Sequence, residues 1–263
     1  MINVRYRGGI GNRLFQYCFG RILAESLGWR LECRAIDGFP GTKARIHGKS
    51  FPGPTILYGP RANVDLPATL SDPSPRKIVV SGWLQKYDYY RDHAASIKCW
   101  LEPAASPAGR FPIAGPDDLV LHLRIGPDYE SRRWVLHPQF YESILQRRDQ
   151  FDKVYICYDL KKKPSDRMRE ACLAPLARWN PHVFESGDPM TDFNFVRQFR
   201  NIAIAPSTFC WWAAYLSNAR AIYFPDLRSS RTSCWRRRRP VDYLRPEVDE
   251  PRYVYSPAKT LWD

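Results

Sequence analysis

Short apolar runs alternate with amphipathic segments along most of the 263-residue chain. The runs are bounded by glycine or charged residues, which predicts buried strands, and apolar residues spaced three or four apart between them predict helices. This alternation is typical of a doubly wound parallel sheet. In the first half it predicts strands at 2–7, 30–36 and 77–84 and helices at 12–27 and 87–101. In the second half it predicts strands at 119–124, 153–158, 182–185, 202–205 and 221–224, and helices at 138–148, 165–179, 190–199 and 208–216.

Two segments interrupt this pattern. Residues 37–76 are rich in proline and glycine and are expected to be irregular, and "PAASPAGRFPIAGPD" at 103–117 is typical of a linker. We therefore predict an α/β protein with two Rossmann-like parallel-sheet domains facing a cleft. Residues 1–105 form the first domain and 106–117 the linker, and 118–263 form the second domain with a basic tail. In such sheets ligands bind at the carboxyl ends of the strands.

The chain has a net charge of +13, and 30 of its 40 basic residues are arginine. Guanidinium groups suit the recognition of phosphate and carboxylate. The partners that fit this charge are nucleic acid, a nucleotide, an acidic glycan or an anionic membrane surface. With 44% hydrophobic residues, the chain has ample material for a packed core.

Seven scattered cysteines with no CxxC pair are typical of reduced thiols, so we expect a cytoplasmic protein. Arginines interrupt the N-terminus as early as Arg5, so no signal peptide is predicted, and no run approaches the ~20 apolar residues of a membrane span. The run Arg236, Arg237, Arg238 and Arg239 has no nucleic-acid-binding motif beside it. We expect a solvated tail or a peripheral contact with the inner face of the membrane, and no nucleic-acid partner.

The stretch "RGGIGNRLFQY" at 7–17 forms a glycine turn between the first strand and the first helix. It lacks the full GxGxxG spacing of dinucleotide sites. Two interpretations remain open: Gly9, Gly11 and Asn12 contact a phosphate, or they form a tight turn with Asn12 as the helix N-cap. Gln16, one turn further on, would point its amide toward the same cleft.

The stretch "LVLHLRIGPDY" at 119–129 places His122 and Arg124 at alternate positions near the end of a buried strand. Alternation puts both side chains on one face of the sheet, at the edge where ligands bind. A buried arginine needs an anionic partner. That partner is either a bound phosphate or a structural carboxylate such as Asp128.

The stretch "DFNFVRQFRNIAIAPSTFCWW" at 192–212 carries Asp192 on a helix ahead of a strand, and Ser207 and Thr208 after it. A carboxylate can accept both N–H donors of a guanine edge. A strand that stops and restarts as a helix leaves N–H groups that bind anions. The alternative is that Asp192 and Ser207 only cap their helices. Trp211 and Trp212 are expected to be packing residues.

Several motifs are absent from the sequence: it has no Asp-X-Asp triplet, no Walker loop, no HExxH and no GxSxG. The carboxylate pair that usually holds a divalent metal on a nucleotide-sugar is therefore missing. We expect no metal and no other cofactor, with phosphate charge met by Arg124 and backbone N–H groups.

Four blocks in this order, "GGIGNRLFQYCFGRILAESLG", "VSGWLQKYDYYRDH", "LHLRIGPDY" and "NIAIAPSTFCWWAAYL", make the chain resemble the bacterial α1,2-fucosyltransferases, glycosyltransferase family eleven. The resemblance runs from about residue 4 to about residue 226, and the first and last blocks are its most specific parts. It implies a metal-independent, inverting GT-B enzyme of polysaccharide biosynthesis. Such an enzyme takes L-fucose, or a related 6-deoxyhexose, from a GDP-sugar to a hydroxyl of a glycan, including a lipid-linked one.

The resemblance also implies roles for single residues. His122 and Arg124 match the HxRxG motif whose arginine contacts the donor pyrophosphate, Asp192 matches a guanine-binding carboxylate, and Ser207 with Thr208 matches the phosphate turn. Asp128 and His122 are the candidate general bases. Gln16, Trp83 and Tyr87 are the acceptor-side candidates.

The chain departs from the family pattern HxRRGDY, because Ile125 replaces the second arginine and Pro127 is inserted before Asp128. The "SDD" that often follows the next strand is reduced to Tyr158-Asp159. An alternative to the enzyme is therefore a catalytically silent protein of the same fold that binds GDP or a glycan.

Overall fold

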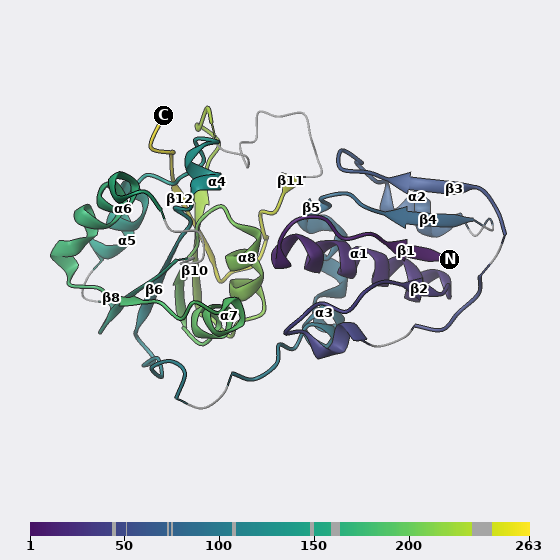
Figure 1. The fold of residues 1–263 in the computed structure, drawn as a ribbon, viewed down its shortest axis with the longest axis horizontal. Coiled ribbons are helices and arrows are strands. Elements are labelled where there is room, and N and C mark those ends of the chain that lie inside the picture. The colour runs from purple at the N-terminus through teal and green to yellow at the C-terminus, as the bar shows by residue number, and fades with distance from the viewer. Residues whose placement is uncertain are drawn as a thin grey trace. The chain divides into compact units, whose positions relative to one another are not determined.

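The computed structural model describes residues 1–43, 46–50, 52–72, 74, 76–106, 109–147, 150–158, 164–232 and 244–263. The chain divides into two compact units (Figure 1). The first comprises Met1–Ala104 with Pro240–Val248, and the second Ala105–Arg239 with Asp249–Asp263. The sequence pattern predicts that all of 118–263 lies in the second domain. Residues 244–248 instead belong to the first unit, where β11 (Leu244–Arg245) pairs in parallel with β5 (Gln85–Lys86).

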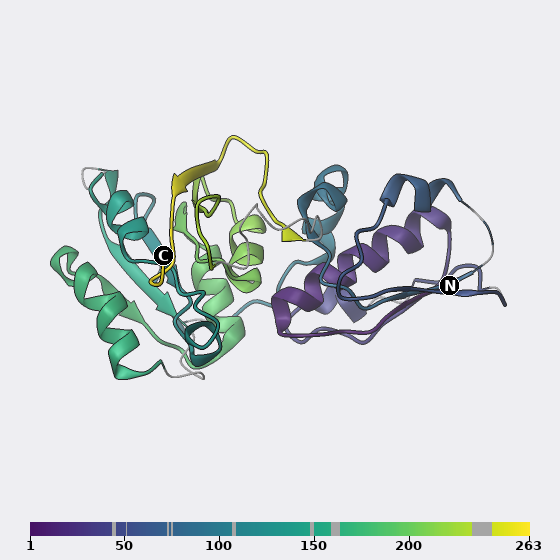
Figure 2. The ribbon, with the colours of Figure 1, turned by 90° about the horizontal axis from the view of Figure 1, so that it is seen from above.

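The first unit is built on a parallel sheet with the strand order β2-β1-β4-β3. Its strands are β1 (Ile2–Val4), β2 (Leu31–Glu32), β3 (Thr55–Tyr58) and β4 (Lys77–Val80). Helix α1 (Ile10–Leu27) packs against β1, as Figure 2 shows. The helix ends where expected, at Gly28, whose φ of 65° is the left-handed conformation that glycine adopts at little cost. The remaining helices of this unit are α2 (Leu66–Ser71) and α3 (Ala94–Trp100).

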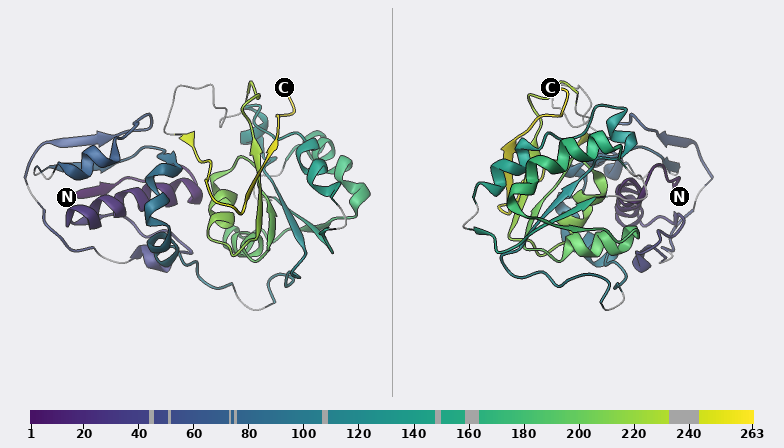
Figure 3. Two further views of the ribbon diagram at one scale, coloured as in Figure 1. Left: turned by 180° about the vertical axis from the view of Figure 1, so that it is seen from behind. Right: turned by 60° about the vertical axis from the view of Figure 1, so that its left-hand side comes forward.

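The second unit is built on a six-stranded parallel sheet with the order β12-β10-β9-β6-β7-β8. Its strands are β6 (Leu119–Leu123), β7 (Val154–Tyr158), β8 (His182–Phe184), β9 (Asn201–Ala203), β10 (Ala221–Asp226) and β12 (Tyr253–Pro257). Its helices are α4 (Pro127–Glu130), α5 (Gln139–Leu145), α6 (Asp166–Leu173), α7 (Pro189–Arg197) and α8 (Thr208–Tyr215). In chain order these strands read 6-5-4-1-2-3, the doubly wound order. Helices α5 and α6 cover one face of the sheet, and α7 and α8 cover the other (Figure 3).

The α/β class with two parallel sheets is therefore as predicted, whereas several elements differ. The segment 37–76 holds β3 and α2, and the tail after 226 holds β12. The expected helix at 87–101 is broken into two short 3₁₀ turns followed by α3. The expected helix at 165–179 ends early and continues as a 3₁₀ turn, in which Pro175 lacks the N–H that an α-helix needs.

The core of the second unit is strongly aromatic around α8. Trp211 and Trp212 are both fully buried, and the Trp211 ring stacks on Tyr215 at 4.9 Å between centroids. The two tryptophans are packing residues, as expected. Because α8 is buried from Cys210 to Tyr215, the turn that precedes it is held at a fixed place at the end of β9.

Candidate functional site

The order in which the chain visits the strands of the six-stranded sheet reverses between β6 and β9. From β6 the chain moves through β7 to β8, then returns to β9 on the other side of β6 and continues outward to β10 and β12. In doubly wound sheets, ligands bind at the carboxyl ends of the two strands where the order reverses. Here those ends carry Arg124, just after β6, and Ser207 with Thr208, after β9. Two sets of residues separated in the sequence thus reach the same strand edge.

Arg124 is held by its own following turn. Its Nη2 lies 2.9 Å from Asp128 Oδ2, and its Cζ lies 5.0 Å from the centroid of the Tyr129 ring. Its side chain is 16% exposed, so the charge is mostly withdrawn from water. Both partners sit on α4, which Pro127 opens at the first helical position. Of the two predicted partners of Arg124, the structural carboxylate Asp128 is therefore present.

The substitution at Ile125 has a simple packing consequence. Ile125 is 3% exposed and lies among apolar side chains that include Leu136 and Tyr141. A second arginine at this position would place a charge in apolar surroundings, which is costly without a partner.

The turn between β9 and α8 carries the other half of the site. Ser207 is the N-cap residue in an extended conformation, and its side chain makes no capping bond to the helix within the described part of the chain. The first N–H groups of an α-helix have no partner within the helix, so this end carries partial positive charge. Thr208 is half-buried, and the Tyr129 hydroxyl donates to Pro206 O at 2.8 Å.

His122 lies deeper than the sequence suggested. It is 3% exposed, its ring centroid is 6.0 Å from that of Phe209, and its carbonyl oxygen accepts a 2.9 Å hydrogen bond from Tyr141 Oη. His122 thus lies within the packing of the sheet and α8, and a side chain this deeply buried is a poor candidate for proton exchange with a substrate.

Asp192 lies in the first turn of α7 and is 8% exposed. It is not the helix cap, because Asp188 is the N-cap and accepts from Thr191 N at 2.8 Å. Asp192 Oδ1 instead accepts a 2.5 Å hydrogen bond from Ser186 Oγ. Helices α7 and α8 are in contact, so Asp192 and the Ser207 turn come from neighbouring helices.

The glycine turn of the first unit begins α1 earlier than expected. The N-cap is Gly9, and Asn12 is the third helical residue, with its Oδ1 accepting from Gln85 Nε2 at 2.8 Å. The interpretation of Asn12 as N-cap is therefore wrong. Gly8 has a φ of 75°, and a Cβ there would overlap the Asn12 side chain, so this position requires glycine. Gly9 is exposed, whereas Gly11 is buried.

The three acceptor-side candidates differ in exposure. Gln16 is fully buried, with its Oε1 accepting from Arg7 N at 2.8 Å and its Nε2 donating to Arg7 O, so it holds the loop after β1. Tyr87 is 3% exposed, and Arg91 covers its ring. Neither offers a ligand-facing surface, contrary to expectation. Trp83 is half-buried and retains accessible surface.

Sequence reasoning missed three residues at this edge of the second unit. Tyr129 contacts both Arg124 and the β9–α8 turn, Ser186 bonds Asp192, and Glu185 accepts a short hydrogen bond from Tyr158 Oη. Burial, followed by the hydrogen bond and charge of Glu185, raises the pKa of Tyr158 to about 12. The signal that could have found Tyr129 is its place five residues after Arg124 in the same quoted block.

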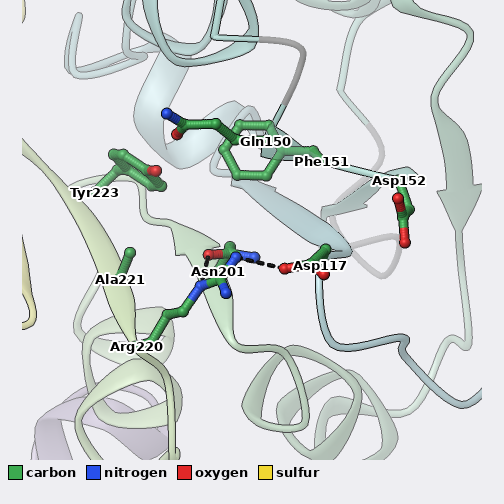
Figure 4. Close-up of a pocket in the computed structure, with 8 residues that line it drawn as sticks. All are labelled: Asp117, Gln150, Phe151, Asp152, Asn201, Arg220, Ala221 and Tyr223. Carbon is green, nitrogen blue, oxygen red and sulfur yellow. Dashed lines mark hydrogen bonds and ion pairs between the residues drawn. The ribbon is translucent and has the colours of Figure 1, made fainter.

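A cavity of about 570 Å³ lies at the opposite edge of the same sheet (Figure 4). Arg220 there forms an ion pair with Asp117 at 2.6 Å and donates to Asn201 Oδ1 at 3.2 Å. This cavity is at the amino-terminal ends of the strands, whereas ligands of doubly wound sheets bind at the carboxyl ends. We therefore place the candidate site at the carboxyl edge.

Among the described residues, no cluster of three or more His, Cys, Asp or Glu side chains could hold a metal ion. Likewise, none of the described helices combines the length and apolar character needed to cross a bilayer. Asp159 and the run Arg236, Arg237, Arg238 and Arg239 lie outside the described residues.

Comparison with protein-family models gives no match for this chain, and comparison with curated proteins also gives none.

Proposed function

We propose that this protein is a GT-B glycosyltransferase that moves L-fucose, or a related 6-deoxyhexose, from a GDP-sugar to a hydroxyl of a glycan, with α1,2 linkage. The observation that carries the proposal is a paired arginine and an uncapped helix start at the switch point of a doubly wound sheet. That combination suits a diphosphate, because both groups offer positive charge from separate strands. The specific sugar and linkage rest on the sequence resemblance alone.

In the proposed reaction, the acceptor oxygen attacks the anomeric carbon while the bond to the diphosphate breaks, which inverts that carbon. Negative charge grows on the departing GDP, and Arg124 with the start of α8 would stabilise it without a metal. To do so, the diphosphate would share Arg124 with Asp128. Asp192 would accept the N–H donors of guanine, and Ser186 would hold its carboxylate in place.

The two candidate bases fit donor binding better than proton transfer. Asp128 is committed to Arg124 at 2.9 Å, and His122 is buried beneath Phe209. A general base must reach the acceptor hydroxyl within hydrogen-bond distance. We therefore assign Asp128 to the support of Arg124 and His122 to packing against Phe209, and the base to a group outside this set.

The competing proposal is a protein of the same fold that binds GDP or a glycan without turnover. Ile125 motivates it, because a family arginine is missing beside Arg124. In contrast, Pro127 begins the short helix that brings Asp128 to Arg124, so the insertion supports the site. Release of GDP from a panel of GDP-sugars, with glycan acceptors present, distinguishes the two proposals.

The decisive experiment is a thermal-shift titration with GDP, UDP and GDP-fucose in EDTA. A ligand that binds only the folded state raises the melting temperature by mass action. We expect GDP and GDP-fucose to raise it and UDP to do so much less. A strict requirement for Mn²⁺ or Mg²⁺, or equal shifts by GDP and UDP, would contradict the proposal.

The arginine run at 236–239 would add peripheral binding to anionic membranes, where a lipid-linked acceptor is found. Sedimentation with phosphatidylglycerol vesicles tests this part. We expect binding that weakens with salt and is lost when all four arginines are changed to serine. Equal binding to neutral phosphatidylcholine vesicles would contradict it.

A further inference from the structure

Tyr129 joins the ends of the two strands that flank the switch point. It belongs to α4, directly after β6, and its hydroxyl donates a 2.8 Å hydrogen bond to the carbonyl of Pro206, 77 residues away and next to Ser207. This bond ties the loop after β6 to the turn that starts α8. Neither the sequence motifs nor the proposed reaction gives this tyrosine a role.

The same side chain also supports Arg124. The guanidinium lies over the Tyr129 ring, with 5.0 Å between Cζ and the ring centroid. The Tyr129 ring also contacts Trp134 edge-on, with 5.8 Å between the ring centroids and 83° between the ring planes. Cation–π contacts of this kind hold a guanidinium plane in a preferred position. Tyr129 therefore contacts the charged group through its ring and the β9–α8 turn through its hydroxyl.

These two contacts of Tyr129 hold the Arg124 guanidinium at a set distance from the turn before α8. A diphosphate carries two charged groups, and here the two positive features that would hold them come from different strands. If the loop after β6 moved relative to the turn before α8, one contact would be lost when the other formed. A preorganised pair avoids the free-energy cost of ordering the two loops at binding.

We infer that Tyr129 is a positioning residue, which sets the distance between the Arg124 guanidinium and the Ser207–Thr208 turn for binding of a diphosphate. The inference rests on the proposed function only in taking a diphosphate as the ligand. It requires neither guanine nor a sugar.

The test uses inorganic pyrophosphate as the probe and isothermal titration calorimetry as the measurement. Tyr129→Phe keeps the ring under Arg124 and removes the hydroxyl that bonds Pro206, so we expect pyrophosphate affinity to fall by about threefold to tenfold. Tyr129→Leu also removes the ring, so we expect its pyrophosphate affinity to fall further. Each variant's melting temperature is recorded, so that a loss of folding is not mistaken for a loss of binding.

The matched control is Tyr6→Phe. The Tyr6 hydroxyl also donates to a backbone carbonyl, that of Arg34 at 2.9 Å, but in the first unit. A merely structural tyrosine–carbonyl bond would lower the melting temperature in both variants alike. We expect the Tyr6 variant to keep the wild-type pyrophosphate affinity.

A double-mutant cycle tests whether Tyr129 acts through Arg124. In an Arg124→Ala background, Tyr129→Phe should change the residual pyrophosphate affinity by less than about twofold. The reason is that Arg124, one of the two groups whose spacing Tyr129 sets, is already absent. The same loss in both backgrounds would overturn the inference.

Two other outcomes would overturn it: wild-type affinity in folded Tyr129→Phe and Tyr129→Leu, or no pyrophosphate binding by the wild type. Failure of the proposed function has a different signature. If pyrophosphate binds with the expected Tyr129 dependence but GDP binds no better than UDP, the positioning role stands and the guanine-nucleotide proposal falls.

Discussion

Two arginine–aspartate ion pairs lie at opposite edges of the six-stranded sheet. Arg124 and Asp128 are 2.9 Å apart at the carboxyl edge, and Arg220 and Asp117 are 2.6 Å apart at the amino edge. The side chain of Arg124 is 16% exposed, whereas that of Arg220 is 54% exposed. The chemical groups are the same, so their surroundings must account for any difference in role.

The surroundings differ in what each guanidinium faces. Arg220 also bonds Asn201, a strand residue at the amino edge. Arg124 lies over an aromatic ring whose hydroxyl reaches the start of a buried helix. Exposed ion pairs contribute little because water and salt screen them, whereas a mostly buried charge is screened less. Under the proposed function, the position of Arg124 at the switch point is what distinguishes it from Arg220.

The largest expected effect is that of Arg124→Ala. If its charge acts mainly as the leaving group gains charge, kcat for GDP-fucose should fall by about 10²- to 10³-fold with a small change in donor KM. Arg124→Lys should restore little, because an ammonium lacks the planar fork. Steady-state kinetics and melting temperatures are measured together.

Arg220→Ala is the matched control for that experiment, since it breaks the corresponding ion pair at the other edge. We expect its kcat and KM to stay within about twofold of the wild type, and its stability to change by no more than the roughly 0.2–1 kcal/mol of an exposed pair. Equal kinetic losses in the two variants, or a folded Arg124→Ala protein with normal kcat, would remove the distinction between the two edges.

The next effect concerns the proposed recognition of guanine by Asp192. Asp192→Ala should weaken GDP binding by about 1.5–3 kcal/mol, the scale of hydrogen bonds to a charged group, and should leave pyrophosphate binding unchanged. Ser186→Ala removes the hydroxyl that bonds Asp192, together with its bonds to the Asp188 backbone, and should give a smaller loss. Calorimetry with GDP, UDP and pyrophosphate checks this. Parallel losses for all three ligands would assign Asp192 a structural role.

A third comparison concerns a mostly buried arginine at the C-terminal end of α8 and an exposed arginine elsewhere in the second unit. Arg252 donates to the carbonyls of Tyr215 and Ser217 at 2.9 and 3.0 Å, and its side chain is 15% exposed. A cation at a helix C-terminus is stabilising, so Arg252→Ala should lower the free energy of unfolding by about 1–2 kcal/mol in urea titrations. Arg228→Ala removes a cation that is 63% exposed in its pair with Asp226, and should change it by less than about 0.5 kcal/mol. A similar loss in both would show that burial of the cation is unimportant.

The smallest effect is a pH dependence from Tyr158. Its pKa is raised to about 12, by burial first and then by Glu185, from an ordinary value near 10. The folded state therefore favours the neutral phenol, and this contribution to stability is complete below pH 10 and is lost as the pH rises toward 12. Tyr158→Phe should lose less stability than the wild type between pH 10 and 11.5, measured by urea unfolding. Identical pH profiles would contradict the assigned pKa.

Local pattern determined much of the secondary structure. The apolar runs that predict strands at 119–124 and 153–158 are β6 and β7, and Gly28 ends the first helix as expected. These features depend on neighbouring residues alone, through apolar periodicity and the conformational freedom of glycine. Pro/Gly-rich composition was a poorer guide, because the segment 37–76 contains β3 and α2.

The sequence by itself determined which residues carry the candidate chemistry: Arg124 near a strand end, Asp192 on a helix, and Ser207 with Thr208 at a helix start. Only the tertiary structure decided how they are used. It buried His122, Gln16 and Tyr87, and it paired Asp192 with Ser186. It also brought Tyr129 to Pro206 across 77 residues, and added β12 to the sheet from the tail. The physical reason is that strand order, burial and side-chain pairing depend on contacts between distant parts of the chain, which local periodicity does not encode.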